Sequence, residues 1–365
     1  MNRRSRNFLR NLSFNLTFCV LAGVLFVIFR FFGTFDFENP GTPISSLHLM
    51  HAFLEGFAVG ILNGFSITVI DLLVDTERFK RRSFRYTIIF KSLAYCFSIA
   101  ISVVLIFGLN DLLMGKQEIP VKIDSDTGNR ITRMYIIAVF TYIICMNVLL
   151  NLFKEADKKF GPGVMLKLFS GRYYHPVIEE RIFMFLDLKS STSIAERLGH
   201  IKYSRLVQDC FYDVTDIVEK YHAEIYQYVG DEIVLTWETE KGIENENCIW
   251  FFFEFQKKLA KNSERYTEYY NVVPEFKAGI NCGSVTVCEI GEIKKDIAYH
   301  GDVLNTASRI QGLCNTYNKE VLISEMLNKK VPKEKFFKRE LIGEILLRGK
   351  EAPVGVYSLE IPKSN

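Results

Sequence analysis

Four apolar stretches in the first 153 residues constrain this chain more than any other feature. They cover residues 13–33, 48–73, 86–109 and 134–153. A helix needs about 20 apolar residues to cross a bilayer, so each stretch is long enough for one span. The first follows a basic start but ends without a small-residue cleavage site, so it is counted as a span rather than a signal peptide. The sequence therefore predicts an N-terminal all-α transmembrane bundle of four spans.

The basic residues beside these stretches predict the orientation of the bundle. Four arginines precede the first span, and five basic residues lie between positions 78 and 85, after the second span. The loop after the first span has no basic residue, and the loop after the third mixes basic with acidic ones. The positive-inside rule then puts the N-terminus and the C-terminal half in the cytoplasm. We expect a multi-pass protein of the cell inner (plasma) membrane, with the lipid bilayer as a partner.

One ionisable group in the second span stands out. His48, His51 and Glu55 fall on or near one helical face. Burying an ionisable group at bilayer depth is costly, so Glu55 is expected to have a specific partner. Two interpretations stay open: a hydrogen bond between helices, or part of a ligand or ion site.

Charge and cysteine usage exclude several classes of protein. The formal net charge of +3 gives no reason to propose a nucleic-acid partner. The eight cysteines form no CxxC pair and have no accompanying histidine cluster. Neither a zinc site nor a disulfide framework is indicated, which is typical of a reduced, cytosolic environment.

Composition divides the chain into three parts. Residues 1–153 form the predicted transmembrane domain, and residues 181–365 have the pattern of a separate folded domain. Gly161, Pro162 and Gly163 cannot continue a helix, so the fourth helix should end near Phe160. Residues 154–180 are expected to be a linker that couples the two domains.

The C-terminal part alternates short β-branched runs with longer helical ones. One hairpin is expected around Gly230 and Asp231, and a second is expected to join residues 276–283 to residues 284–290. The order of elements predicts an α+β, ferredoxin-like domain with helices over a mainly antiparallel sheet.

Two carboxylates are expected to meet at one edge of this sheet. Asp187 ends the first strand, and Asp231 lies in the turn of the first hairpin, which is predicted to be its neighbour. Two close carboxylates repel unless a cation lies between them, and hard oxygen ligands suit Mg²⁺ or Mn²⁺. The helix that follows Asp187 offers backbone N–H groups to a triphosphate, and its capping residues are expected to contact phosphate: Ser190, Ser191 and Thr192.

Five blocks carry a resemblance to a known family. They are FMFLDLKSST, YQYVGDEIV, FKAGINCGSV, GDVLNTASRI and LLRGKEAPVGVYSL. In order and spacing they resemble the catalytic domain of class III nucleotidyl cyclases, the adenylyl and guanylyl cyclases, over roughly residues 180–361. The resemblance implies conversion of a nucleoside triphosphate to its 3′,5′-cyclic monophosphate and pyrophosphate, for intracellular signalling.

The resemblance also assigns metal ligands. Asp187 and Asp231 match the two aspartates that bind a pair of Mg²⁺ or Mn²⁺ ions, and the backbone carbonyl of Leu188 adds a ligand.

The remaining matched residues imply the catalytic groups and the assembly. Asn305 and Arg309 lie on one helix face and match the pair that orients the ribose and stabilises the reacting phosphate. Lys350 matches the basic residue on the triphosphate tail. In this family the two sets come from different domains, so a chain that carries both is expected to form a homodimer with two equivalent sites.

The two positions that read the base depart from the family pattern. They are Gln227, often Lys in adenylyl and Glu in guanylyl cyclases, and Ala298; a register slip would bring Tyr299 or Asp296 to the latter place. Gln can pair with either purine. ATP is favoured on the family's general usage, and GTP or a pyrimidine triphosphate stays open. A catalytically weak nucleotide-binding receptor module is the rival of another class.

Overall fold

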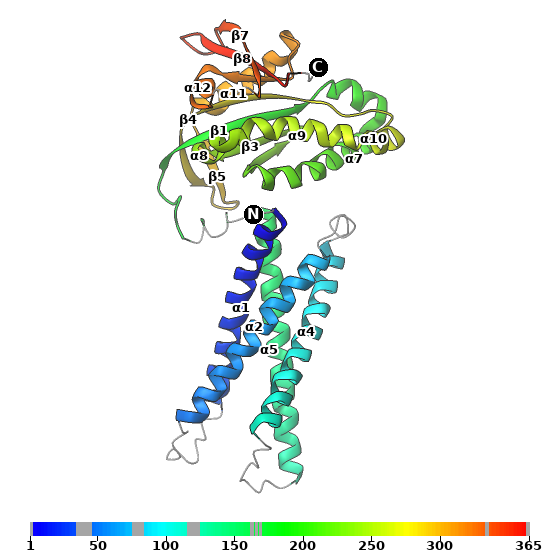
Figure 1. Cartoon of the computed structure of the whole chain (residues 1–365), viewed down its shortest axis with the longest axis vertical. Coiled ribbons are helices and arrows are strands. Elements are labelled where there is room, and N and C mark those ends of the chain that lie inside the picture. Colours follow the sequence, from blue (N-terminus) through cyan, green and yellow to red (C-terminus); the bar gives the residue numbers. More distant parts are fainter. Residues whose placement is uncertain are drawn as a thin grey trace. The chain divides into compact units, whose positions relative to one another are not determined.

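The computed structural model describes most of the chain, and Figure 1 traces its helices and strands. Contacts divide the chain into two compact units, Met1–Phe160 and Gly161–Asn365. The described residues are 3–33, 46–74, 84–114, 125–160, 164, 167, 170–332 and 336–362.

The described residues of the N-terminal unit form four long helices, as predicted. They are α1 (Arg3–Gly33), α2 (Ser46–Val74), α4 (Phe84–Met114) and α5 (Ser125–Phe160). Three of them are long and apolar enough to cross a membrane, over Asn11–Phe29, Phe53–Val74 and Ile137–Asp157. The expectation of four such spans is only partly met among the described residues. In α4 the apolar run is the shorter Tyr86–Ser102, and the side chains at 106–109, which the prediction included, lie outside the described ones.

Glycines bring α1 and α2 into close contact. A Cβ atom on Gly23 would lie 2.3 Å from the carbonyl oxygen of Gly56, closer than real Cβ atoms approach. Gly60 and Gly64 continue the four-residue spacing on α2, and a Cβ on either would lie 2.7 Å from a backbone atom of α1. Small residues at this spacing let two helix backbones pack directly against each other.

A buried ionic cluster connects three of these helices. Asp71 of α2 accepts hydrogen bonds from Lys91 of α4 at 3.0 Å and from Lys154 of α5 at 2.7 Å. The hydroxyl of Tyr95, also on α4, donates to the same carboxylate. The one carboxylate lies between two ammonium groups, so its charge offsets part of the cost of burying both lysines.

The C-terminal unit is built on an eight-stranded sheet. Its strands run in the order β2-β3-β1-β4-β6-β8-β7, and β5 pairs with β4 outside this path. Every pair is antiparallel except β4 with β6, so the mainly antiparallel expectation is confirmed. The bounds are β1 Val177–Leu188, β2 Glu224–Val229, β3 Glu232–Glu238, β4 Phe276–Ile290, β5 Asp296–His300, β6 Val321–Ser324, β7 Lys338–Ile345 and β8 Val354–Glu360.

Helices cover the two faces of this sheet differently (Figure 1). Alternation along β1 decides which side chains meet which helices. Its even positions from Ile182 to Leu188 pack against α7, α9 and α10, whereas Phe183 and Phe185 pack against Val303 and Ala307 of α11. The bounds are α7 Ser191–Lys220, α9 Asn247–Lys261, α10 Ser263–Tyr270 and α11 Asp302–Thr316, with the short α8 Thr239–Ile243, η1 Glu244–Glu246 and α12 Glu325–Lys330.

The predicted hairpin between residues 276–283 and 284–290 is wrong. Phe276–Ile290 is one continuous strand, β4, and it pairs with the whole length of β1, from Val177 opposite Val287 to Leu188 opposite Phe276. Gly283 does not mark a turn. It makes room for α11, because a Cβ there would lie 2.9 Å from a methyl carbon of Val303.

Candidate active site

Three carboxylates gather where β1 ends and β3 begins. Asp187 lies directly opposite Glu232 in the β1–β3 register, and Asp231 occupies the turn just before it. The turn is tight because Gly230 has a φ of 63°, a left-handed conformation that glycine adopts without strain. The hairpin predicted around Gly230 and Asp231 is therefore confirmed, and so is its position beside the first strand.

Asp187 points to the face of the sheet that α11 covers. Its Oδ2 atom accepts a hydrogen bond of 3.0 Å from the side-chain amide of Gln311 on α11. The same oxygen lies 3.2 Å from the ammonium nitrogen of Lys277, the residue opposite it on β4. Lys277 also donates to the side-chain oxygen of Asn315 at 3.2 Å. These contacts hold the carboxylate in one orientation and neutralise part of its charge.

The carboxylate of Asp231 has fewer hydrogen-bond and ion-pair partners than that of Asp187. Its Oδ2 atom is buried and has no hydrogen-bond partner among the described residues. Tyr203 of α7 lies beside it and beside Ser191, and burial together with the Asp231 charge raises the pKa of Tyr203 to about 12. Burial, and then the charges of Asp187 and Asp231, raise the pKa of Glu232 to about 7. The edge is thus a site of concentrated negative potential that a cation would relieve.

Helix α11 presents a second set of groups on another face. Residues two apart on an α-helix point about 200° apart, so the contact of Gln311 with Asp187 directs Arg309 away from that carboxylate. Arg309 packs against Gly349, and its Nη1 atom is buried without a hydrogen-bond partner among the described residues. Asn305, one turn earlier on the same face, is exposed.

Lys350 lies next to this second set. Its ammonium group forms an ion pair with Asp302 at the start of α11. Burial disfavours the charged form of Asp302, but hydrogen bonds from Lys350 and Thr306 and the charges of Lys350 and Arg309 lower its pKa overall. The three residues that the sequence predicted for ribose and phosphate, Asn305, Arg309 and Lys350, therefore lie around one helix.

The residues after Asp187 lead into α7 as predicted, but the helix cap differs from the prediction. Leu188 is buried in the core, so only its backbone is free to act as a ligand. Ser190 occupies the N-cap of α7 with a left-handed φ of 54°, and its side chain makes no capping hydrogen bond, contrary to expectation. A capping side chain ordinarily requires a β-region backbone at this place. Ser191 and Thr192 follow in the first helical turn.

The two predicted base-reading residues have different surroundings. Gln227 is exposed on β2, next to a bulge between Ile225 and Gln227. Ala298 on β5 is buried, opposite Cys288 of β4.

The alternatives raised for Ala298 also differ from each other. The ring of Tyr299 packs edge-on against Phe183 and Tyr226, whereas Asp296 is exposed. Of the four residues considered for base recognition, only Gln227 and Asp296 are therefore exposed to solvent in a single chain.

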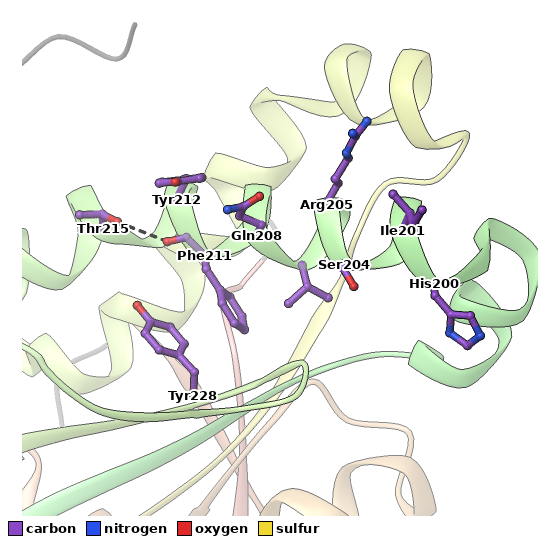
Figure 2. Close-up of a pocket in the computed structure, with 10 residues that line it drawn as sticks. His200, Ile201, Ser204, Arg205, Gln208, Phe211, Tyr212, Thr215 and Tyr228 are labelled. Atoms are coloured by element: carbon purple, nitrogen blue, oxygen red, sulfur yellow. Dashed lines mark hydrogen bonds between the residues drawn. The ribbon is translucent and has the colours of Figure 1, made fainter. Parts of the chain in front are cut away.

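A broad groove of about 780 Å³ runs along α7 near the end of β2 (Figure 2). Figure 2 shows the ring of Phe211 next to that of Tyr228 in the wall of the groove, and the two rings stack with their centroids 4.7 Å apart. The side chains of Ile201 and Tyr228 are exposed by 74% and 50%, so the groove, which polar side chains such as Arg205 also line, presents apolar groups to solvent.

One comparison decides the family. The model of the adenylate and guanylate cyclase catalytic domain matches residues 174–360, half of the chain. The chain belongs to this family. From here the C-terminal unit is called the cyclase domain.

Individual relatives agree with this assignment. Adenylate cyclase 2 of Rhizobium meliloti (strain 1021) is 37% identical over 199 residues, 54% of this chain and 55% of that protein. An adenylate cyclase of Anabaena cylindrica is 26% identical over 184 residues, 48% of this chain and 36% of that protein. A solved bacterial light-regulated adenylyl cyclase has a TM-score of 0.51 at 17% identity over 66% of each chain, a likeness of fold. The chain spans about half the length of the first relative.

Sequence reasoning missed three residues of the cyclase domain site. Lys277, Gln311 and Tyr203 contact the carboxylate edge, and the local sequence around Gln311 and Tyr203 gives no sign of this. Lys277 alone gave a signal, since a lysine inside an apolar strand needs a buried partner.

The carboxylate edge fits divalent cations. Among the described residues no three His, Cys, Asp or Glu side chains form a complete metal site. Mg²⁺ is commonly held by one or two carboxylates together with substrate phosphates. The unpartnered oxygen of Asp231 beside Asp187 provides such an incomplete site.

Proposed function

We propose that the cyclase domain converts a nucleoside triphosphate, ATP in the first place, to its 3′,5′-cyclic monophosphate and pyrophosphate. The observation that carries this is a pair of buried, unpartnered atoms of opposite charge: Asp231 Oδ2 at the carboxylate edge and Arg309 Nη1 on α11. Buried polar atoms are rarely left without a partner, so both sites are suited to a ligand that supplies one. A metal-bound triphosphate supplies a cation to the first and phosphate oxygens to the second.

The residues divide the work as follows. Asp187, Asp231 and the carbonyl of Leu188 would hold two Mg²⁺ or Mn²⁺ ions. When bound, these ions would lower the pKa of the attacking 3′-hydroxyl and neutralise phosphate charge. Arg309 would donate its planar fork to the phosphate as negative charge grows on it, and Asn305 would orient the ribose.

Phosphate binding at the other positions requires local changes. Lys350 would leave Asp302 to bind the triphosphate tail, since the two are paired here. The N–H groups at the start of α7, with the hydroxyls of Ser190, Ser191 and Thr192, would donate hydrogen bonds to the remaining phosphate oxygens.

We further propose that the active enzyme is a homodimer. Because Arg309 points away from the Asp187 of its own chain, two chains side by side would complete two equivalent sites. The groove on α7 supports this, since its exposed apolar side chains Ile201 and Tyr228 would be covered by a second copy.

ATP is proposed because both relatives named above are adenylate cyclases. Gln227 carries both a donor and an acceptor, so GTP is the second candidate and a pyrimidine triphosphate the third. The apolar helices support anchoring in the inner membrane, with the cyclase domain in the cytoplasm for signalling.

The deciding experiment supplies the purified full-length protein with Mn²⁺ and, separately, each of the four ribonucleoside triphosphates. Cyclic product and pyrophosphate are measured by chromatography. We expect cyclic AMP as the main product. Binding of ATP without any cyclic product would instead identify a nucleotide-binding receptor module.

Mixing two inactive variants tests the shared site. Asp187→Ala and Arg309→Ala should each be inactive, because each removes one half of every site. Random assortment makes half of the dimers mixed, each with one intact site, so about a quarter of wild-type activity should return on co-expression. If both variants dimerise and no activity returns, the site is not shared.

A further inference from the structure

A cavity lies inside the N-terminal unit, where all four helices contribute to its wall. Its volume is about 180 Å³. The wall is mainly apolar, with side chains that include Phe18 of α1, Val59 of α2, Ile99 of α4 and Ile143 of α5. An apolar cavity of about 150 Å³ can hold one benzene-sized molecule, so this space is large enough for a small organic ligand.

Two asparagines give this apolar wall a polar character. Asn63 of α2 and Asn147 of α5 both line the cavity, and their side chains are 5% and 2% exposed. The Oδ1 atom of each is buried and has no hydrogen-bond partner among the described residues. The amide nitrogen of Asn147 is already committed, since it donates to the carbonyl of Ile143 at 2.9 Å.

These two oxygens lack a hydrogen-bond donor, and the described residues of the cavity wall do not supply one to either of them. A carbonyl oxygen can only accept, and a buried acceptor without a donor is unfavourable, most of all where no water is present. Glu55, the residue singled out in the second apolar stretch, lines the same cavity but already has an interaction partner, so among the described side chains of the wall only the two asparagine oxygens are unpartnered acceptors. The site therefore has an excess of hydrogen-bond acceptors within an apolar wall.

We propose that this cavity binds a small, uncharged, largely apolar molecule that carries a hydrogen-bond donor, such as a hydroxyl or ring N–H group on one aromatic ring. The ring would fill the apolar volume, and the donor would bond to the oxygen of Asn63 or Asn147. A cation is a poorer occupant, because most of the wall offers no ligand atoms. An apolar molecule without a donor would leave both oxygens unsatisfied.

The test compares two probes that differ in the donor. 4-Fluorophenol and 4-fluorotoluene have nearly the same shape, and their binding to the full-length protein in lipid nanodiscs can be titrated by ¹⁹F NMR against empty nanodiscs. We expect saturable binding, with the phenol bound roughly five- to tenfold more tightly, as one net hydrogen bond provides. Failure of both probes to saturate, or equal affinities, would overturn the proposal.

Paired variants identify the site. Asn63→Leu combined with Asn147→Leu should reduce the preference for the phenol to about one, whereas Asn15→Leu should retain it. Asn15 is buried in the same unit and its oxygen also lacks a partner, but it does not line the cavity. A preference that persists in the double variant would contradict the assignment.

A filling variant provides a test that does not depend on the asparagines. Val59→Phe places a ring in the cavity and should abolish saturable binding of both probes. Its control is Val104→Phe on α4, where the side chain is 71% exposed and outside the cavity. Unchanged binding in Val59→Phe would show that the probes bind elsewhere and would overturn the proposal. Water held by the two oxygens would appear as no probe binding in any variant, which also overturns it.

Discussion

Gln311 donates a hydrogen bond of 3.0 Å to the Oδ2 atom of Asp187, and this contact fixes the rotation of α11 about its own axis. With Gln311 turned toward the sheet, Arg309 must face away from it. The helix therefore supports the carboxylate edge of its own chain while it presents an arginine elsewhere.

Lys277 would compete with the proposed metal ion for Asp187. Its ammonium lies 3.2 Å from the same oxygen that Gln311 contacts. Lys277→Met removes that positive charge and should lower the Mn²⁺ concentration for half-maximal activity about five- to tenfold. Lys220→Met, which breaks an ion pair with Glu254 elsewhere on the domain, should leave it unchanged. A higher Mn²⁺ requirement in Lys277→Met would mean that the lysine assists the metal instead.

Glu232 should make the metal-free cyclase domain less stable as the pH rises. Its pKa is raised from 4.5 to about 7, so between these values the folded state binds a proton that the unfolded state has lost. The free energy of unfolding should then fall from about pH 4.5 to about pH 7. Glu232→Gln should remove this decrease. Urea unfolding in EDTA can be followed by Trp237 and Trp250 fluorescence, since both tryptophans of the chain lie in this domain.

Glu238 is the matched control for that measurement. Its pKa is lowered, chiefly by a hydrogen bond from Lys241. It contributes stability above its unfolded pKa that is lost as the pH falls through its folded pKa. Glu238→Gln should therefore change stability with the opposite dependence on pH. The same slope in both variants would contradict the assignment to Glu232.

Gly279 allows α11 to approach β4. A Cβ there would lie 2.2 Å from the backbone nitrogen of Gln311 and 2.5 Å from the carbonyl oxygen of Ala307. Gly279→Ala should push the helix away, lower activity by at least about tenfold and destabilise the domain by about 1–3 kcal/mol. On the same helix, Gly312→Ala meets nothing within 4 Å and should stabilise it by up to about 1 kcal/mol. Unimpaired activity in Gly279→Ala would show that the approach of α11 is not needed.

Gln227 should control the choice of base. It is exposed on β2, so substitution there costs little stability. Gln227→Glu should increase the ratio of kcat/KM for GTP to that for ATP, because a carboxylate accepts the two donors of a guanine edge, and Gln227→Lys should decrease it. Tyr228→Phe, next to it, should leave the ratio unchanged. Equal ratios in all variants would place base recognition elsewhere.

The local sequence pattern was sufficient to predict the two aspartates of the carboxylate edge. Asp187 at a strand end and Asp231 in a glycine turn were expected at one edge, and the β1–β3 register puts them there. Lys277 and Gln311 depend on which strands and helices become neighbours over long separations, which no local pattern contains.

Glycine was the least reliable sequence signal for a turn between strands. Gly230 does form a turn, with a φ of 63°, but Gly283 serves close packing against Val303 within a continuous strand. The same residue type thus answers two different physical needs, and only the packed structure distinguishes them.

The unbroken β1–β4 pair has a mechanical consequence. β1 and β4 pair from Val177 to Leu188 without a register shift, a length of about 40 Å at ~3.3 Å per residue. At one end, the amide of Glu289 on β4 donates to the carbonyl of Tyr173 at 2.8 Å, close to where the domain begins. At the other end lies Asp187. The pair is therefore one continuous two-stranded ribbon with Tyr173 near one end and Asp187 at the other, so a change in its twist beside Tyr173 is expected to shift the carboxylate that we propose as a metal ligand.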